Sequence, residues 1–401
     1  MAVTGLGVIC ALGHNLSQVW DALRGGRPGI ATIGSLDISS LRFACGAEVR
    51  NYEPKKHFSA DKLNLTDRFA QFAVIAAREA LLDSGVVLTD GLRDRTAVFC
   101  GTSMGGQVAQ DAAFVDLYQQ GRERVHPLTI ARIMASAGAS HISMEFGTTG
   151  PALAISTACS SSNHAIGQAY HLLRNGDADL AVAGGSDAPF SYGVLKAWEA
   201  MRVIAPDTCR PFSVDRQGTI LGEGGAMLIL EPLDAARARG AKVYAEIAGF
   251  GMSSDAHHIT QSSVTGPARA MRAALRDANM HAEEVGYINA HGTATQSNDS
   301  AEAHAILDVF GAGSKRLAVS STKSMHGHAL GAAGALEAVA TAMALHEGIL
   351  PPTANFTGPD PECDLDVVAN RARTASVECA LSNSFAFGGL NAVLAFRAAR
   401  N

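Results

Sequence analysis

The sequence predicts an α/β fold in which helices cover a central, largely parallel sheet. Short apolar runs with a β-prone composition alternate with longer helical stretches along the whole chain. The 41 glycines and the aromatic content of only 6% suit tight turns and close packing of helices on a sheet. With 401 residues, 47% of them hydrophobic, the chain can bury the core of one large α/β unit or of two to three domains.

The strands are expected where apolar runs are short, and the helices where the runs are longer and mixed with polar residues. In chain order, the expected strands are residues 3–9, 96–100, 152–156, 180–183, 226–230, 243–247, 285–288, 317–320, 378–382 and 392–396. The expected helices between them are residues 67–84, 165–175, 268–279, 300–309 and 332–347.

The two halves of the chain share a rough pattern. Each opens with a glycine-rich strand exit, Gly5-Leu-Gly7 in the first half and Gly249-Phe-Gly251 in the second. Each later has a strand that runs into a turn rich in glycine or serine. This pattern predicts a duplication with N-terminal half 1–240 and C-terminal half 241–401, and no flexible linker joins them.

Composition excludes several classes of protein. The net charge of −6 argues against nucleic-acid binding, and an acidic protein partner would need a local basic patch. No apolar run is long enough for a membrane helix, and the N-terminus lacks the basic residues of a signal peptide. Seven scattered cysteines without a CxxC pair predict neither disulfides nor a zinc ribbon and fit a cytoplasmic protein.

Cys159 is the most informative residue, because it stands where an apolar strand meets a helix that opens with serines. The segment reads Ala154-Ile-Ser-Thr-Ala-Cys159-Ser-Ser-Ser-Asn-His164. A helix N-terminus carries a partial positive charge and unpaired N–H groups, which stabilise a thiolate and bind an oxyanion. The position fits a nucleophile, and a buried structural cysteine is the alternative.

Three further segments place reactive groups or glycines where a strand enters a turn. They are residues 287–295 with His291, residues 319–337 with Lys323, His326 and His328, and residues 383–389 with their glycine turn. Loops at strand ends usually hold functional groups, and a glycine turn lets the backbone approach a reacting carbonyl.

One cysteine with several histidines also admits other chemistries. His326 and His328 are possible zinc ligands, but no third ligand has a recognisable spacing. A papain-like protease would pair Cys159 with His291, but this cysteine is far from the N-terminus. The segment Gly101-Thr-Ser103-Met-Gly105 matches the G-x-S-x-G of serine hydrolases without an accompanying oxyanion motif. We expect neither a metal nor a cofactor.

Taken together, these segments resemble the β-ketoacyl-acyl-carrier-protein synthases of the thiolase-like superfamily, in their elongating type I/II form. The resembling motifs, in family order over nearly the whole chain, are Thr157-Ala-Cys159-Ser, Asn289-Ala-His291-Gly-Thr293-x-Thr295, Lys323-Ser-Met-x-Gly-His328 and Asn383-Ser-Phe-x-Phe387-Gly-Gly389. The resemblance implies duplicated βαβ halves stacked in five layers, α-β-α-β-α.

The resemblance also implies a decarboxylative Claisen condensation. Cys159 would take an acyl chain from an acyl carrier protein as a thioester. Malonyl-acyl-carrier protein would then lose CO₂ and attack that thioester to give 3-oxoacyl-acyl-carrier protein, in fatty-acid or specialised acyl-chain synthesis. The alternative is a chain-length-factor-like partner subunit, but such subunits lack the nucleophilic cysteine.

By the same resemblance, His291 and His328 would donate Nε2–H groups to the enolate oxygen that forms on loss of CO₂. Lys323, held by Glu337, would keep both imidazoles neutral. The backbone N–H groups of Cys159 and Phe387 would form a second oxyanion hole, for the thioester carbonyl.

The remaining implied sites concern the substrates. Thr293 and Thr295 would bind the phosphopantetheine arm, with turn capping as the alternative. Met104, Thr129 and Ile130 would line the acyl tunnel, with Phe387 as a gate, and Phe385 would also bind the substrate. The residues implied for carrier docking are Lys62, Arg68 and Arg202. The family implies a homodimer, with the tunnel partly completed by the second subunit.

Three residues depart from the pattern of the fatty-acid enzymes. His326 stands where threonine is common, and Ser161 and Ser162 replace a pair of small residues after the nucleophile. The segment His326-Gly-His328, together with Pro351-Pro-Thr-Ala-Asn355 and Asp360-Pro-x-Cys-Asp-Leu-Asp366, resembles the nodulation protein E branch, which builds specialised unsaturated acyl chains.

Overall fold

The computed structural model describes residues 1–399 and has one eleven-stranded central sheet. Its strands lie in the order β12-β10-β9-β14-β15-β8-β1-β7-β6-β4-β5. At the junction of β8 and β1 only Ala2 and Val3 pair across, with Glu246 and Ala245. The sheet therefore consists of two halves joined by a very short ladder.

The two halves repeat one topology. The first contains, in spatial order, β5 (Ala152–Ile155), β4 (Thr96–Gly101), β6 (Leu180–Asp187), β7 (Gly224–Glu231) and β1 (Ala2–Cys10). The second contains β10 (Ala318–Ser320), β9 (Val285–Asn289), β14 (Cys379–Ala386), β15 (Leu390–Ala398) and β8 (Ala245–Ser254), with β12 (Asp366–Val367) beyond β10. This repeat supports the predicted division near residue 240, which stays a prediction.

The expectation of a largely parallel sheet is wrong for four strands. In each half the first three strands are parallel, but β7 and β1, and likewise β15 and β8, pair antiparallel. Helices cover both faces of the sheet, so parallel and antiparallel strands alike are continuous apolar runs. The hydrophobic pattern therefore does not indicate the direction of a strand.

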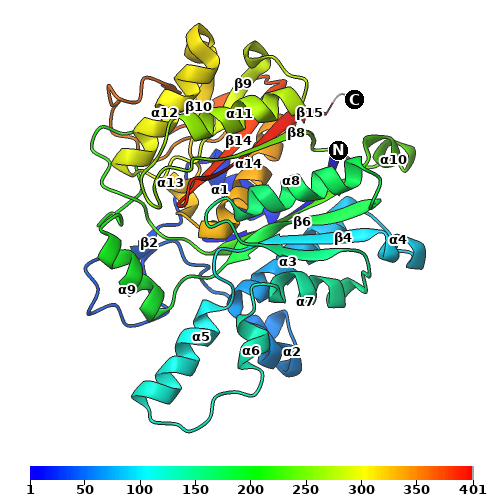
Figure 1. Cartoon of the computed structure of the whole chain (residues 1–401), viewed down its shortest axis with the longest axis vertical. Helices are drawn as coiled ribbons and strands as arrows, with labels where there is room; N and C mark the ends of the chain where they lie inside the picture. Colours follow the sequence, from blue (N-terminus) through cyan, green and yellow to red (C-terminus); the bar gives the residue numbers. More distant parts are fainter. Residues whose placement is uncertain (400–401) are drawn as a thin grey trace.

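Helices complete the five expected layers (Figure 1). Between the two half-sheets lie α8 (Ser161–Arg174) and α14 (Ala333–Glu347). The outer helices are α3 (Arg68–Ser84) and α7 (Ala137–Phe146) on the first half, and α11 (Thr265–Asp277) and α12 (Gln296–Phe310) on the second. Residues 333–345 of α14 are all buried, as a helix in the middle layer requires.

Shorter elements complete the chain. The further helices are α1 (Leu16–Arg24), α2 (Ala60–Leu65), α4 (Asp90–Asp94), α5 (Gln107–Phe114), α6 (Thr129–Ile133), α9 (Tyr192–Met201), α10 (Leu233–Ala238) and α13 (Lys323–His326). The further strands are β2 (Ala31–Thr32), β3 (Cys45–Gly46), β11 (Ile349–Leu350) and β13 (Arg373–Thr374). Together with α2, α5 and α6 form a lobe that projects from the layered body (Figure 1). Within residues 1–399, every helix is too short or too polar to cross a bilayer.

The parallel strands bring distant parts of the chain to one edge. Since β9, β10 and β14 run in the same direction, their carboxyl ends at Asn289, Ser320 and Ala386 lie together. The segments that follow them carry His291, Lys323 to His328 and Phe387, as expected from the strand pattern.

Candidate active site

Cys159 lies in the turn between β5 and α8, and its side chain is buried. Ala158 before it has a φ of 49°, in the left-handed region that favours glycine. The hydroxyl of Ser161 holds this strained turn, because it accepts from the N–H of Thr157 at 2.9 Å and donates to the carbonyl of Ala158 at 2.6 Å. One of the two serines that depart from the family pattern therefore shapes the turn of the nucleophile.

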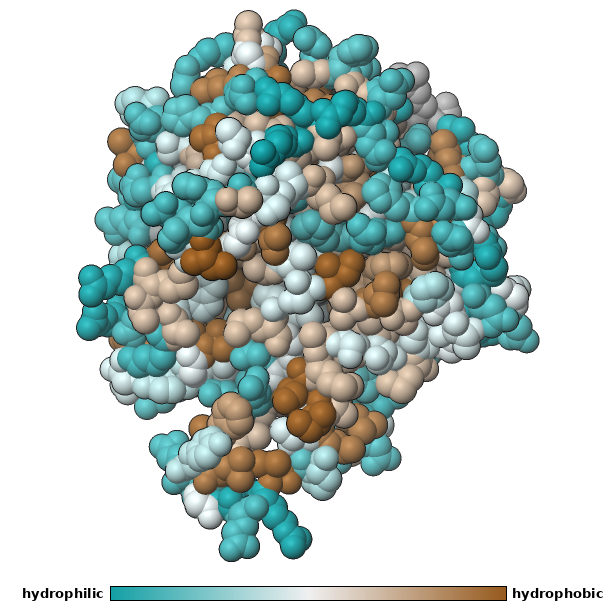
Figure 2. Space-filling view, viewed as in Figure 1, coloured by the Kyte–Doolittle hydropathy of each residue, from teal (hydrophilic) through white to brown (hydrophobic). Residues whose placement is uncertain are grey.

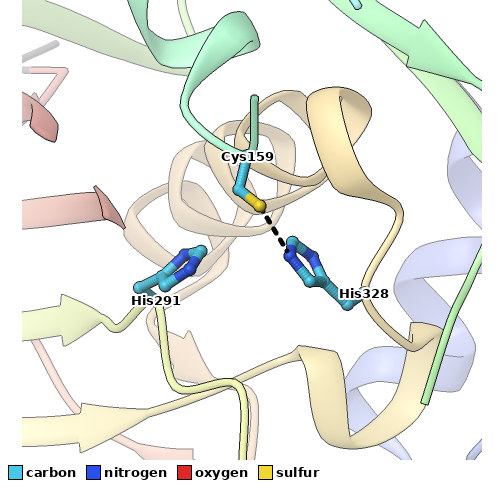
Figure 3. A group of neighbouring side chains, drawn as sticks. All are labelled: Cys159, His291 and His328. Atoms are coloured by element: carbon cyan, nitrogen blue, oxygen red, sulfur yellow. Dashed lines mark hydrogen bonds between the residues drawn. The ribbon is translucent and has the colours of Figure 1, made fainter. Parts of the chain in front are cut away.

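Three side chains from three segments meet at the sulfur (Figure 3). The Nε2 atom of His328 lies 3.0 Å from Sγ of Cys159. The rings of His291 and His328 are 5.5 Å apart and perpendicular. The sulfur and one nitrogen of each ring all lie within 4.8 Å of one another. The structure thus brings together the cysteine and both histidines that the motifs singled out.

The fully buried Lys323 determines which nitrogen of His291 carries the proton. Its Nζ donates to the carbonyl of His291 at 2.6 Å and lies 3.3 Å from Nδ1 of the same residue. An ammonium has only donors, so Nδ1 accepts and Nε2 carries the hydrogen. Glu337 forms the ion pair that holds Lys323. His291 therefore presents an N–H donor to the site.

Both histidines are neutral. Burial, and then the charge of Lys323, lower the pKa of His291 and of His328 well below the ordinary value. Burial also raises the pKa of the Cys159 thiol to about 12, although Lys323 opposes that rise. The residue is therefore a thiol at rest, and the N-terminus of α8 stabilises negative charge as it develops.

The three groups also match the dimensions of a metal site, but the proton position argues against one. A metal would need the lone pair of Nε2 in His291, and that atom holds a hydrogen because Nδ1 faces Lys323. Both ring nitrogens of His326 have protein partners, Gly327 and Thr322. The arrangement is that of hydrogen-bond donors around a nucleophile.

Sequence reasoning missed Glu302, which holds the loop of His291 from α12. Its carboxylate accepts from the N–H of His291 at 2.9 Å, from the N–H of Gly292 at 2.7 Å and from Nδ2 of Asn383 at 3.1 Å. Burial raises its pKa to about 7, against these hydrogen bonds. The only signal in the sequence was an acidic residue on the buried face of a helix.

A cavity of about 230 Å³ leads from the cysteine and the two histidines to the surface. One side is lined by hydroxyls, among them those of Thr293 and Thr295, which lie 3.0 Å apart. Thr295 also accepts from the N–H of Asn298 and caps α12, so its capping and pocket-lining roles coexist.

Aromatic side chains also line the cavity, namely Trp198, Phe385 and Phe387. Phe385 packs edge-on against His291, with ring centres 6.1 Å apart. Phe387 is 37% exposed and stacks on Trp198 at 6.1 Å and 25°. It is followed by Gly388 and Gly389, whose φ values of 82° and 69° only glycine adopts without strain. Sequence reasoning did not identify Trp198.

The implied tunnel residues Met104, Thr129 and Ile130 lie outside the lining of this cavity. They belong to the projecting lobe and the turn that leads to it, where Met104 is 46% and Ile130 69% exposed. Apolar residues gather on this lobe (Figure 2). The role of these residues in a tunnel stays a prediction.

The three docking candidates occupy different environments. Lys62 is ion-paired with Glu145. Arg68 donates to buried Glu223 at 2.6 Å and 2.8 Å, which makes it a structural residue rather than a free surface charge. Arg202 is exposed and follows Met201, which lines the cavity. Of the three, only Arg202 is next in sequence to residues that line the cavity.

The segment Gly101 to Gly105 forms a turn without a histidine partner. The hydroxyl of Ser103 donates to Asp187 at 2.7 Å, and its backbone N–H donates to the same carboxylate at 2.9 Å. Ser103 is thus a fixed structural residue and fits no hydrolase nucleophile.

Comparisons with known proteins agree over the full length. The models of the β-ketoacyl synthase N-terminal and C-terminal domains match residues 1–236 and 244–357. Nodulation protein E of Rhizobium sp. (strain N33) is 47% identical over 99% of this chain and 98% of its own length. The 3-oxoacyl-[acyl-carrier-protein] synthase 2 of Staphylococcus aureus (strain N315) is 37% identical over 99% and 98%. A type II polyketide ketosynthase, solved in complex with its acyl-carrier protein and bound to a hexaketide, is 30% identical with a TM-score of 0.88 over 99% of both chains.

Proposed function

The chain belongs to the β-ketoacyl synthase family, and from this membership and the site geometry we propose that it is a 3-oxoacyl-acyl-carrier-protein synthase. It condenses an acyl thioester with malonyl-acyl-carrier protein and releases CO₂. The observation that carries this proposal is the cavity in which Sγ of Cys159 meets the two neutral histidines. Inactive partner subunits lack the cysteine, so the chain-length-factor alternative is disfavoured.

In the first half-reaction, Sγ of Cys159 attacks the thioester carbonyl of an acyl carrier protein. The backbone N–H groups of Cys159 and Phe387 receive the developing oxyanion. The carbonyl re-forms as the bond to the pantetheine sulfur breaks, and that sulfur takes up the proton that the thiol gives up. Nε2 of His328 lies 3.0 Å from Sγ, within hydrogen-bond distance of the attacking sulfur.

In the second half-reaction, a malonyl thioester loses CO₂ and leaves an enolate. Its oxygen accepts the Nε2–H groups of His291 and His328, each worth about 3 kcal/mol when aligned. The enolate carbon then attacks the acyl thioester on Cys159. A carbon–carbon bond forms, the bond to Sγ breaks, and the sulfur takes up a proton from water.

Elongation with purified carrier proteins tests this function. Radiolabelled malonyl-carrier protein and an acyl-carrier primer should give 3-oxoacyl-carrier protein with release of CO₂. Cys159→Ala should form no acyl-enzyme by mass spectrometry, whereas Cys10→Ala, a buried cysteine on β1, should behave as the wild type. Hydrolysis of the primer without elongation would contradict the proposal.

The finer parts of the function are also proposals. The 47% identity to nodulation protein E, against 37% to the synthase 2 enzyme, supports a specialised acyl substrate. Seven free cysteines support a cytoplasmic location. A mass-spectrometric screen of acyl chains trapped on Cys159 would identify the substrate, and a housekeeping range of saturated primers would contradict specialisation.

A homodimer completes the proposal. The edge strand β5 leaves Leu153 53% exposed, and Met104 and Ile130 are exposed on the lobe. Apolar residues of this kind beside a free strand edge fit a surface covered by a second copy. That copy would enclose the tunnel that a single chain leaves open.

A further inference from the structure

His326 is a buried histidine that the condensation leaves without a role. It ends α13, two residues before His328, and is 2% exposed. It does not belong to the group formed by Cys159, His291 and His328. A histidine so completely enclosed, beside the charge of Lys323, is costly unless its ring is fully hydrogen-bonded.

The hydrogen bonds of the ring leave one arrangement of its proton. Nδ1 lies 2.8 Å from the carbonyl oxygen of Gly327, which can only accept, so Nδ1 carries the hydrogen. Nε2 lies 3.0 Å from the hydroxyl of Thr322 and accepts from it. Burial, and then the charge of Lys323, lower the pKa of His326 to about 3, so the ring is neutral at any working pH.

These bonds connect the two segments that carry the site histidines. Thr322 in turn accepts a bond from Nδ2 of Asn289 at 3.4 Å, and Asn289 ends β9 two residues before His291. At the other end of the chain of bonds, Gly327 precedes His328. The ring of His326 therefore lies between the end of β9 and the loop of His328.

The ring of His326 is one of several groups that hold the loop of His328. Gly327 has a φ of 67°, outside any regular structure, so its peptide is oriented by its partners. The N–H of His328 donates to the carbonyl of Ile220 at 2.6 Å, which holds the loop from one side. Within the same loop, the side chain of His326 donates to the carbonyl of Gly327, the residue before His328.

We propose that His326 is a positioning residue for the second half-reaction. Its neutral ring fixes the peptide between Gly327 and His328 relative to the end of β9, and so keeps the Nε2–H groups of His291 and His328 on one enolate oxygen. This inference rests on the proposed condensing function. His326 contacts no reacting atom and acts only through its neighbours.

The tautomer and the charge of the His326 ring can be tested without an assay of enzyme activity. In protein labelled with ¹⁵N-histidine, a long-range proton–nitrogen spectrum distinguishes the two neutral forms and the cation. The signal of His326 is the one in the wild-type spectrum that is missing from the spectrum of His326→Asn. This signal should show hydrogen on Nδ1 and stay unchanged from about pH 5 to about pH 9. Titration within that range, or hydrogen on Nε2, would overturn the proposal even if condensation fails in the wild type.

The kinetic test separates the two half-reactions. His326→Leu should release CO₂ from malonyl-carrier protein about 10- to 100-fold more slowly, with unchanged KM and unchanged acylation of Cys159. His326→Asn keeps an N–H for the carbonyl of Gly327 and should recover at least part of that rate. His141→Leu, which removes a histidine from α7, is the matched control. Equal loss of both half-reactions, or no recovery in His326→Asn, would assign His326 a merely structural role.

Thr322→Val provides a second route should His326→Leu fold poorly. It removes the hydroxyl that donates to Nε2 of His326 and accepts from Asn289, and it should lower CO₂ release in the same direction. If the bonds act as one chain, the double variant His326→Asn with Thr322→Val should be no slower than the slower single variant. If the fold-loss of the CO₂ release rate in the double variant equals the product of the two single losses, the two residues act independently. That result would overturn the link to β9.

Discussion

The sulfur of Cys159 is surrounded by groups that carry no charge at rest. Burial opposes ionisation of the thiol, and the two histidines are neutral because burial and Lys323 oppose their protonation. The same lysine thus helps the thiol to ionise and prevents the imidazoles from becoming cations. Its full burial and its pairing with Glu337 keep this single charge in place. Sequence reasoning anticipated the effect on the histidines but not the neutral thiol, since desolvation depends on packing.

The first prediction concerns the thiol. Because burial raises its pKa to about 12, the fraction of thiolate grows with pH up to that value. Alkylation of Cys159 by iodoacetamide should therefore accelerate about tenfold per pH unit between about pH 6 and about pH 10. Modification is measured at Cys159 by mass spectrometry, with Cys159→Ala as background. A plateau below about pH 8 would show that the resting residue is a thiolate.

The second prediction concerns Lys323. Its charge lowers the pKa of both histidines, so its removal raises them. As the pH falls, the two histidines then become protonated at a higher pH than in the wild type. Both stay neutral donors only above that higher pH. In Lys323→Met with Glu337→Gln, which avoids an unpaired buried carboxylate, the acid limb of malonyl decarboxylation should move to higher pH. Lys323→Arg is the charge-retaining control, and an unmoved limb in the double variant would contradict the assignment.

At the scale of elements, the site is a set of strand ends. The expected strands at 285–288, 317–320 and 378–382 are present as β9, β10 and β14, because buried strands are continuous apolar runs. The helices α5, α6 and α9 were not anticipated, since they are only 8, 5 and 10 residues long and contain few turns in which a pattern can repeat. For that reason Trp198, on α9, escaped notice although its ring covers Phe387.

The third prediction tests Phe387 as a gate. Trp198 and Trp20 are the two tryptophans of the chain, so Trp20→Phe leaves Trp198 as the sole reporter. Stacked aromatic pairs gain about 1 kcal/mol, a barrier small enough for an arriving acyl chain to separate the rings. Acylation of Cys159 should then change the emission of Trp198. The same background with Cys159→Ala cannot be acylated and should show no change. Unchanged emission on full acylation would remove Phe387 from the gate.

At the scale of the whole molecule, the duplication places one middle-layer helix between the second and third parallel strands of each half. Cys159 opens α8 in the first half, and His328 precedes α14 in the second. The repeat was faint in the sequence because only glycines at strand exits mark it, whereas the strand order makes it plain. The tunnel residues could be named only by resemblance. Their exposure in one chain shows why spacing alone did not assign them, since a surface between subunits has no pattern within a single sequence.

The fourth prediction follows from that exposure. In solution the protein should have twice the chain mass of 41.6 kDa by light scattering. Leu153→Arg on β5 introduces a charge at the proposed contact and should give monomers, because an interface core tolerates unpaired charge poorly. Leu82→Arg, at a leucine 83% exposed on α3, is the matched control and should remain dimeric. If the second copy encloses the tunnel, the monomeric Leu153→Arg should also lose its preference among primer lengths while Cys159 stays reactive to iodoacetamide. A dimeric Leu153→Arg would exclude β5 from the interface.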